Sequence, residues 1–260
     1  MTLLSDLRRK AGVRSLLSTD NSNPKVAKNI KLGYETAVLH LAPANMSGRE
    51  VCPKRSPGCT AACLHYAGSP AFMQVKNESR IRKTRLFFED RDLFMNILAL
   101  EMLQHLKKHG SKAAFRLNAT SDICWEAKKF NLFSGVPLSG DTIISCFPTD
   151  TIFYDYTAIP NRRVPANYDL TFSLKEQNMN DAILARKAGL NVAVVFFDSD
   201  LPETFAIGDE VLPVIDGDET DFRPADRRNC VVGLKAKGVK GRADETGFVQ
   251  HKSSRLLLAA

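Results

Sequence analysis

From residue 113 onward the sequence alternates short apolar segments with helix-like segments. The clearest apolar segment covers residues 191–197 and lacks the polar alternation of a half-exposed strand. Uninterrupted runs of this kind are typical of strands buried on both faces of a parallel sheet. Because parallel neighbours need crossover connections, the alternation predicts an α/β fold with mostly parallel strands, either a barrel or an open wound sheet.

Apolar patterning and turn residues give the expected boundaries of each element. Strands are expected at residues 36–41, 113–118, 152–157, 168–174, 191–197, 211–215 and 230–234. Helices are expected at residues 72–88, 92–109, 125–133, 141–147 and 181–188. The helix over 92–109 has leucine and isoleucine at helical spacing and ends before Gly110. Residues 1–30 are expected to be a loose N-terminal arm, residues 31–250 a single α/β domain, and residues 251–260 a C-terminal tail.

Composition narrows the class of protein. Hydrophobic residues make up 44% of the 260 residues and charged residues 25%, as in ordinary globular proteins with a sizeable core. The start offers no secretory signal and no apolar run could cross a bilayer, so we expect a cytoplasmic protein of a bacterium or an infected cell, with no membrane partner. The formal net charge of +7 favours non-specific attraction to nucleic acid.

Three of the six cysteines, Cys52, Cys59 and Cys63, lie within one loop of twelve residues that also contains two prolines and a glycine. In a reducing compartment such cysteines are more often metal-bound or buried than disulfide-bonded. Three clustered thiolates without an evident fourth predict a [4Fe–4S] cluster with one iron open to a small ligand. Zinc is the main alternative, with His65 either a fourth ligand or a surface histidine. Three small buried residues are the remaining alternative.

The other three cysteines differ in their surroundings. Cys146 and Cys230 lie in apolar segments, and we expect both in the core. Cys124 follows a polar strand end, where it either approaches the cluster or is simply buried.

Polar side chains follow several expected strands at their carboxyl ends. Because these ends converge at one edge of a parallel sheet, we expect the side chains to surround one opening that binds the ligand. Ser121 or Asp122 is alternatively a helix N-cap, and the acidic residues near 216–221 are alternatively a solvated turn. The candidate ligand-binding residues are Asn118, Ser121, Asp122, Asp155, Lys175, Asp216 and Arg223.

An ordered set of motifs resembles the phage gene product 88 domain family over roughly residues 30–250. The motifs are the cysteine loop, the basic segment 80–85, residues 116–126, 153–157, 167–173 and 191–196, the acidic segment 216–223, and residues 233–238. A cysteine loop after the first strand, followed by βα units, is also similar to radical S-adenosylmethionine enzymes. That similarity implies a partial (β/α) barrel with a site-differentiated cluster. Those enzymes have Cys-x3-Cys-x2-Cys, whereas this chain has Cys-x6-Cys-x3-Cys and no glycine-rich cofactor motif, which argues against S-adenosylmethionine as a cofactor.

Two functions follow from these features. The first is a phage-encoded [4Fe–4S] protein whose open iron binds a small ligand, with redox or radical-type chemistry. The alternative is a nucleic-acid-binding protein of phage replication or host takeover, in which a zinc or iron–sulfur site is structural. The residues identify neither a reaction nor a substrate.

Overall fold

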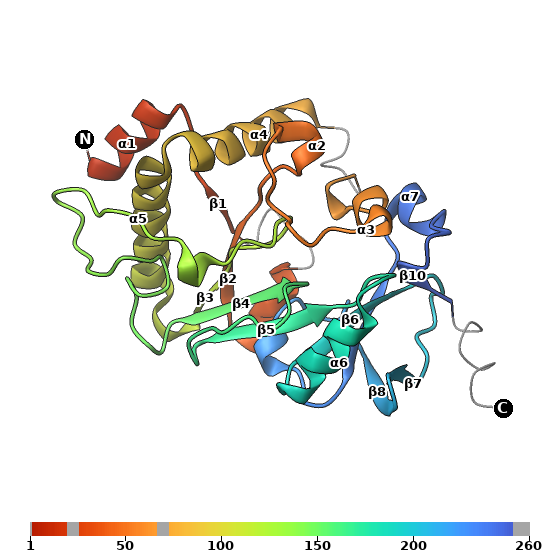
Figure 1. The fold of residues 1–260 in the computed structure, drawn as a ribbon. Coiled ribbons are helices and arrows are strands. Elements are labelled where there is room, and N and C mark those ends of the chain that lie inside the picture. Colours follow the sequence, from red (N-terminus) through yellow and green to blue (C-terminus); the bar gives the residue numbers. More distant parts are fainter. Residues whose placement is uncertain (1, 20–25, 67–72, 252–260) are drawn as a thin grey trace. The chain divides into compact units, whose positions relative to one another are not determined.

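The computed structural model describes residues 2–19, 26–66 and 73–251 (Figure 1). Ten strands in these segments belong to one mostly parallel sheet that does not close. The α/β class with mostly parallel strands is therefore confirmed. Expected features at residues 20–25, 67–72 and 252–260, which include most of the tail, lie outside the described residues.

The chain packs as two compact units, and each is described by itself. Unit 1 contains residues 1–52, 73–155 and 163–169, and unit 2 contains residues 53–72, 156–162 and 170–260. Both units combine segments that are distant in sequence. The single domain expected over residues 31–250 stays a prediction.

The strands of unit 1 follow the order β1-β2-β3-β4. β1 is antiparallel to β2, whereas β2, β3 and β4 are parallel, with Val38 opposite Arg116 in the β2–β3 pair. The carboxyl ends of these three strands therefore share one edge. The bounds are β1 Leu17–Ser18, β2 Glu35–Leu39, β3 Ala113–Arg116 and β4 Ile152–Thr157, whose last two residues belong to unit 2.

Helices cover the sheet of unit 1. α5 packs against β1, β2 and β3, and both α1 and α4 pack against α5 (Figure 1). The Asp90 side chain caps the start of α5, and Gly110 ends it at a φ of 57°. The bounds are α1 Leu3–Ala11, η2 Val26–Leu32, α2 Ala44–Ser47, α4 Gln74–Glu89, α5 Arg91–His109, η5 Gly110–Lys112 and η6 Trp125–Ala127.

Unit 2 has a second set of mostly parallel strands, in the order β5-β6-β9-β8-β7, with β10 beside β6. β7 is antiparallel to β8. Five of the six residues of β6 are buried, as its apolar sequence predicts. The strand bounds are β5 Tyr168–Ser173, whose first two residues belong to unit 1, β6 Asn191–Phe196, β7 Thr204–Ile207, β8 Glu210–Asp216, β9 Val231–Lys235 and β10 Val249–Gln250.

α6 is the longest helix in the described part of unit 2 and packs on β6 and β7. The core here joins Phe172, Val194, Phe196 and Val231 with buried residues of α6. The helix bounds are α3 Pro57–Ala61, η3 Leu64–Tyr66, α6 Met179–Lys187, η7 Arg223–Ala225 and α7 Gly238–Arg242.

Four local expectations were wrong. The segment 1–30, expected to be loose, contains α1 and β1, and Leu4 and Leu16 are buried. Because β1 precedes β2, the cysteine loop follows the second strand. Residues 141–147 form turns in which Ser145 Oγ accepts hydrogen bonds from the backbone N–H groups of Asp141 and Thr142, and this side-chain bonding competes with a helix.

The fourth error concerns the helix expected at residues 125–133, of which only the turn η6 forms. Trp125 is fully buried and lies edge-to-face with Phe87 and stacked on Phe94, at centroid distances of 5.3 and 6.3 Å. Tertiary packing of this large ring therefore overrides the local helical pattern.

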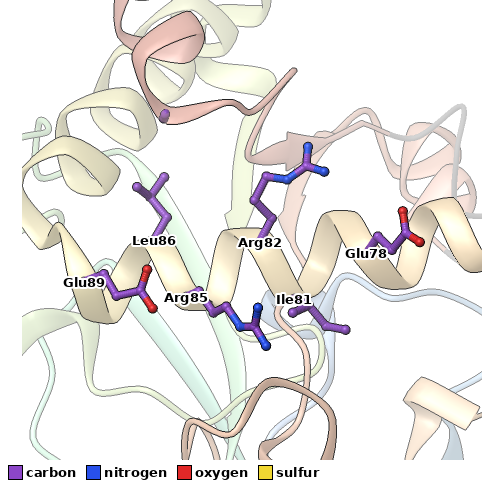
Figure 2. A pocket seen from close by; sticks show the side chains of 7 residues that line it. Glu78, Ile81, Arg82, Arg85, Leu86 and Glu89 are labelled. Carbon is purple, nitrogen blue, oxygen red and sulfur yellow. The ribbon is translucent and has the colours of Figure 1, made fainter.

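A surface depression of about 500 Å³ lies along α4 near the end of α1 (Figure 2). Arg82 on its rim donates a hydrogen bond of 3.0 Å to the carbonyl of Gly12, the residue at which α1 ends. The lining residues are Ala11, Glu78, Ile81, Arg82, Arg85, Leu86 and Glu89. Two acidic and two basic side chains line this face, so we interpret it as a solvated surface region where α1 meets α4. No helix in the described segments is long and apolar enough to cross a membrane.

Candidate functional site

The loop after β3 in unit 1 is organised by the side chain of Asn118. Its Oδ1 accepts hydrogen bonds from Ser121 Oγ at 2.8 Å, the Ile123 N–H at 2.9 Å and Trp125 Nε1 at 3.1 Å. Its Nδ2 donates to the Ile123 carbonyl at 3.0 Å. Asn118 thus uses both amide atoms to fix residues 118–125, the segment that carries Ser121, Asp122 and Cys124.

Asp155 near the end of β4 anchors this loop to the sheet. Its carboxylate is fully buried and accepts hydrogen bonds from the Asn118 N–H at 2.7 Å and the Tyr168 hydroxyl at 2.6 Å. A contact of 3.2 Å also joins it to Asn118 Nδ2. Asp155 therefore ties β3, β4 and the start of β5 together within unit 1. Asn118 and Asp155, both expected to contact a ligand, also bond each other in a structural network.

Cys52 lies against the same loop. The Asp122 N–H donates to the Val51 carbonyl at 2.7 Å, and Cys52 Sγ lies 3.9 Å from the Thr120 carbonyl oxygen. The first thiol of the cysteine loop is therefore held beside the segment that carries Cys124.

In unit 2, Cys59 lies on the short helix α3, whose start is fixed by two side chains. Ser56 caps the helix by accepting a hydrogen bond from the Cys59 N–H at 3.2 Å. The Glu176 carboxylate, just beyond β5, accepts from Ser56 Oγ at 2.6 Å and from the Gly58 N–H at 2.8 Å. Glu176 thus clamps the loop that carries Cys59. Glu176 was not among the candidate residues, because its place after a strand is the one local feature that distinguishes it in the sequence.

Two further contacts hold this loop. Lys175 Nζ donates to the Lys54 carbonyl at 2.5 Å, so this candidate ligand-binding residue braces the loop from the same strand end. Gly58 packs so closely that an added Cβ would lie 2.0 Å from Thr246 Oγ1 and 2.6 Å from Phe248 Cβ. Only glycine fits there without a shift of its neighbours.

The remaining candidate residues of unit 2 are paired with neighbours. Asp216 accepts from Lys235 Nζ at 2.9 Å, across the parallel β8–β9 pair. Buried Arg223 forms an ion pair with Asp226 at 3.0 Å and donates to the Thr220 carbonyl at 2.6 Å. Four of the seven candidates lie in unit 1 and three in unit 2, so the single shared opening stays a prediction.

The six cysteines fall into two groups by burial. Cys146 and Cys230 are buried, as expected; burial raises the pKa of the Cys146 thiol to about 11 and also raises that of Cys230. The other four are half-buried: Cys52, Cys59, Cys63 and Cys124. High thiol pKa values suit inert core residues, whereas half-buried thiols remain accessible to metal.

Within the described residues, no group of three or more His, Cys, Asp or Glu side chains is close enough to hold a metal ion. Cys52 belongs to unit 1, whereas Cys59 and Cys63 belong to unit 2. His65 is buried and lies edge-to-face with Tyr66, so the reading of it as a surface histidine was wrong.

The sequence profile of one protein family, gene product 88, matches residues 14–252. This range includes the cysteine loop, the Asn118 loop and the Glu176 clamp. The chain belongs to the gene product 88 family. No curated protein and no solved structure shows a significant match to it. Membership of the gene product 88 family confirms the resemblance seen in the motifs but assigns no reaction.

Proposed function

We propose that this gene product 88 protein is an iron–sulfur protein in which Cys52, Cys59 and Cys63 ligate a [4Fe–4S] cluster with one iron open to a small ligand. The supporting observation is the division of the cysteines. Of the three cysteines outside the loop, Cys146 and Cys230 are buried with raised thiol pKa values, whereas Cys124 and the three loop cysteines are half-buried. Iron binds the thiolate form, which burial disfavours, so the half-buried cysteines are the better candidates for ligands.

The protein's own contribution would be to position the thiols. Glu176 holds the start of α3 and hence Cys59, and the contact with the Thr120 carbonyl holds Cys52. A cluster with an open iron would supply electron transfer or Lewis-acid binding of a ligand. Because Cys52 and Pro53 are adjacent in sequence, the chain itself links the Cys52 thiol to the loop that carries the other two.

The ligand would contact the loop after β3. Ser121 and Asp122 are our candidates for direct contacts, while Asn118 and Asp155 position them through their mutual hydrogen bonds. We further propose that the open sheet is a partial (β/α) barrel, a proposal supported by the parallel order β2-β3-β4 and by polar residues at its carboxyl edge. S-adenosylmethionine is a secondary proposal, since the cysteine spacing departs from that of the enzymes that use it.

The decisive experiment is metal analysis of anaerobically purified protein, combined with its visible absorption spectrum. Iron and sulfide in equal amounts with broad brown absorption would support the proposal. A colourless protein that contains zinc would overturn it in favour of a structural zinc site.

Single substitutions identify the ligands. Cys59→Ala and Cys63→Ala should each abolish the visible absorption, whereas the matched control Cys230→Ala should retain it. Cys124→Ala tests whether the fourth iron is open: loss of the cluster in this variant would show a closed site instead.

The alternative function, nucleic-acid binding with a structural metal, is tested by a salt titration of DNA binding, because phosphate contacts weaken steeply with salt. The lysines at the end of β9 and just beyond it offer less uncompensated charge than the sequence alone indicates. Lys235 and Lys237 are paired with Asp216 and Asp218 at 2.9 and 2.8 Å.

A further inference from the structure

Two histidines lie one turn apart at the end of α5 in unit 1. His105 and His109 are four residues apart, so they share one face of the helix, and the side chain of the second leans back over the turn that carries the first. Their ring centroids are 4.5 Å apart, and the ring planes are inclined at 41°. His105 is buried and His109 is half-buried, so the pair reaches from the core to the surface.

The imidazole of His105 is held in one orientation by the start of β2. Its Nε2 lies 2.8 Å from the backbone carbonyl oxygen of Glu35. Because a carbonyl oxygen can only accept a hydrogen bond, Nε2 carries the proton and the lone pair of the neutral ring is on Nδ1. Phe115 packs edge-to-face against the same ring at a centroid distance of 5.4 Å. Histidines that bind a metal through one nitrogen usually donate from the other to a carbonyl or carboxylate, so His105 is oriented as a metal ligand is.

Charges of both signs act on the pair. Burial lowers the pKa of the His105 imidazole, and the hydrogen bond to the Glu35 carbonyl opposes this effect. The charges of His109 and Lys108 lower the pKa further, whereas the Glu35 carboxylate raises it. Lys107 and Lys108 are exposed, and the partial negative charge at the carboxyl end of α5 opposes their repulsion of a cation. His105 is therefore neutral at pH 7, the form in which imidazole binds metal.

The separation of the two rings fits one metal ion between them. Metal–nitrogen bonds of about 2.0–2.1 Å would place each ring centroid roughly 3.2 Å from the ion, so centroids 4.5 Å apart correspond to a nitrogen–metal–nitrogen angle of roughly 90°. This angle belongs to square-planar and octahedral coordination rather than to the tetrahedral geometry of structural zinc. Cu²⁺ and Ni²⁺ favour such geometry and accept imidazole ligands.

We propose that His105 and His109 form a two-histidine site for a divalent transition-metal ion of the Ni²⁺ and Cu²⁺ class, bound by His105 Nδ1 and one ring nitrogen of His109. Within the segments that the structure describes, no third His, Cys, Asp or Glu side chain joins the pair in a metal-holding group, so water would occupy the other coordination positions. The ion would fix the end of α5 to the start of β2 through the Glu35 carbonyl and would stabilise the folded chain by mass action. The site uses none of the cysteines of the proposed cluster.

The test is an NMR titration of the full-length protein with Ni²⁺ at neutral pH. Because Ni²⁺ is paramagnetic in octahedral coordination, the imidazole signals of His105 and His109 should broaden together at the first additions. His109→Gln should weaken the effect of Ni²⁺ on His105 at least about tenfold, since even an outer partner of a metal ligand contributes about 10–100-fold to affinity. The matched control is His251→Gln, the same change at an exposed histidine of unit 2, which should leave the affinity unchanged.

Thermal unfolding gives a second readout, which separates metal binding from a purely structural role of the rings. Saturating Ni²⁺ should raise the Tm of the wild type and of His251→Gln but not that of His109→Gln. Mg²⁺, which prefers oxygen ligands, should raise none of the three. Broadening confined to His109, which would show an adventitious surface ion only, would overturn the proposal. A rise in Tm that persists undiminished in His109→Gln would also overturn it.

Discussion

The carboxylate of Glu176 accepts a hydrogen bond of 2.6 Å from the hydroxyl of Ser56, which lies 120 residues earlier in the chain. The same carboxylate binds the Gly58 N–H at 2.8 Å. One side chain just beyond β5 therefore fixes the start of α3, the helix that carries Cys59 in unit 2. This contact makes the geometry of Cys59 dependent on a residue far from it in sequence.

Glu176→Ala should destabilise the fold by about 1–3 kcal/mol, because the Ser56 hydroxyl and the Gly58 N–H lose a charged acceptor. If the cluster is present, its visible absorption should also decay faster on exposure to air. Urea unfolding and absorption measure the two effects. Glu245→Ala, at an exposed position of the same unit, is the control. If both variants unfold at the same urea concentration and lose their absorption at the same rate, Glu176 does not hold the loop that carries Cys59.

Gly58→Ala should destabilise unit 2 by about 1–3 kcal/mol, since its Cβ would overlap Thr246 Oγ1 and Phe248 Cβ. Gly241→Ala is the matched control, because its Cβ would meet no atom closer than 3.8 Å. Thermal unfolding of the two variants gives the comparison. If the Gly58→Ala protein is as stable as the wild type, the segment with Thr246 and Phe248 must move aside at little cost in free energy.

Asp155→Asn should lower the free energy of unfolding by about 2 kcal/mol, because a buried charged acceptor of two strong hydrogen bonds is replaced by a neutral amide. Tyr168→Phe removes one donor and keeps the ring, so about 1 kcal/mol is expected. Urea unfolding at neutral pH measures both. A larger loss of unfolding free energy in Tyr168→Phe than in Asp155→Asn would contradict the conclusion that Asp155 holds this network together.

The stability should fall on acidification because of His40. Burial, and then the charges of Arg80 and Arg116, lower its pKa to about 3 in the folded protein. The pKa is near the ordinary 6.5 in the unfolded chain, so only the unfolded chain takes up a proton between those values. The loss of stability caused by His40 is absent above pH 6.5 and grows as the pH falls toward 3. Between pH 7 and pH 5 it reaches up to about 2 kcal/mol. His40→Gln should show a shallower loss of stability over this range in urea titrations, and an unchanged slope would refute the assignment.

Alkylation should separate the two groups of cysteines in metal-free folded protein. At pH 8 the thiols of Cys146 and Cys230 stay protonated and buried, so iodoacetamide should leave them unmodified. The four half-buried cysteines should react first, as peptide mass spectrometry would show. Early modification of Cys146 would contradict its place in the core.

The sequence by itself determined the elements whose pattern is local. The buried strand β6 and the helix α5 appear where their patterns indicated, and α5 ends at Gly110 because glycine readily adopts the positive φ found there. Such features depend on residues a few positions apart, so composition and spacing suffice to predict them. The spacing of the cysteines can also be read from the sequence alone, and it is the basis of the iron–sulfur proposal.

The tertiary structure decided which distant residues meet. Trp125 does not start the expected helix; its ring packs against aromatic rings and donates a hydrogen bond to Asn118. The carboxylate of Glu176 accepts a hydrogen bond from Ser56, which is 120 residues away in the sequence. The cations around His40 come from α4 and β3, which no local pattern connects. Hydrogen bonds, burial and charge act through space, and the spatial neighbours of a residue are fixed only when the chain has folded.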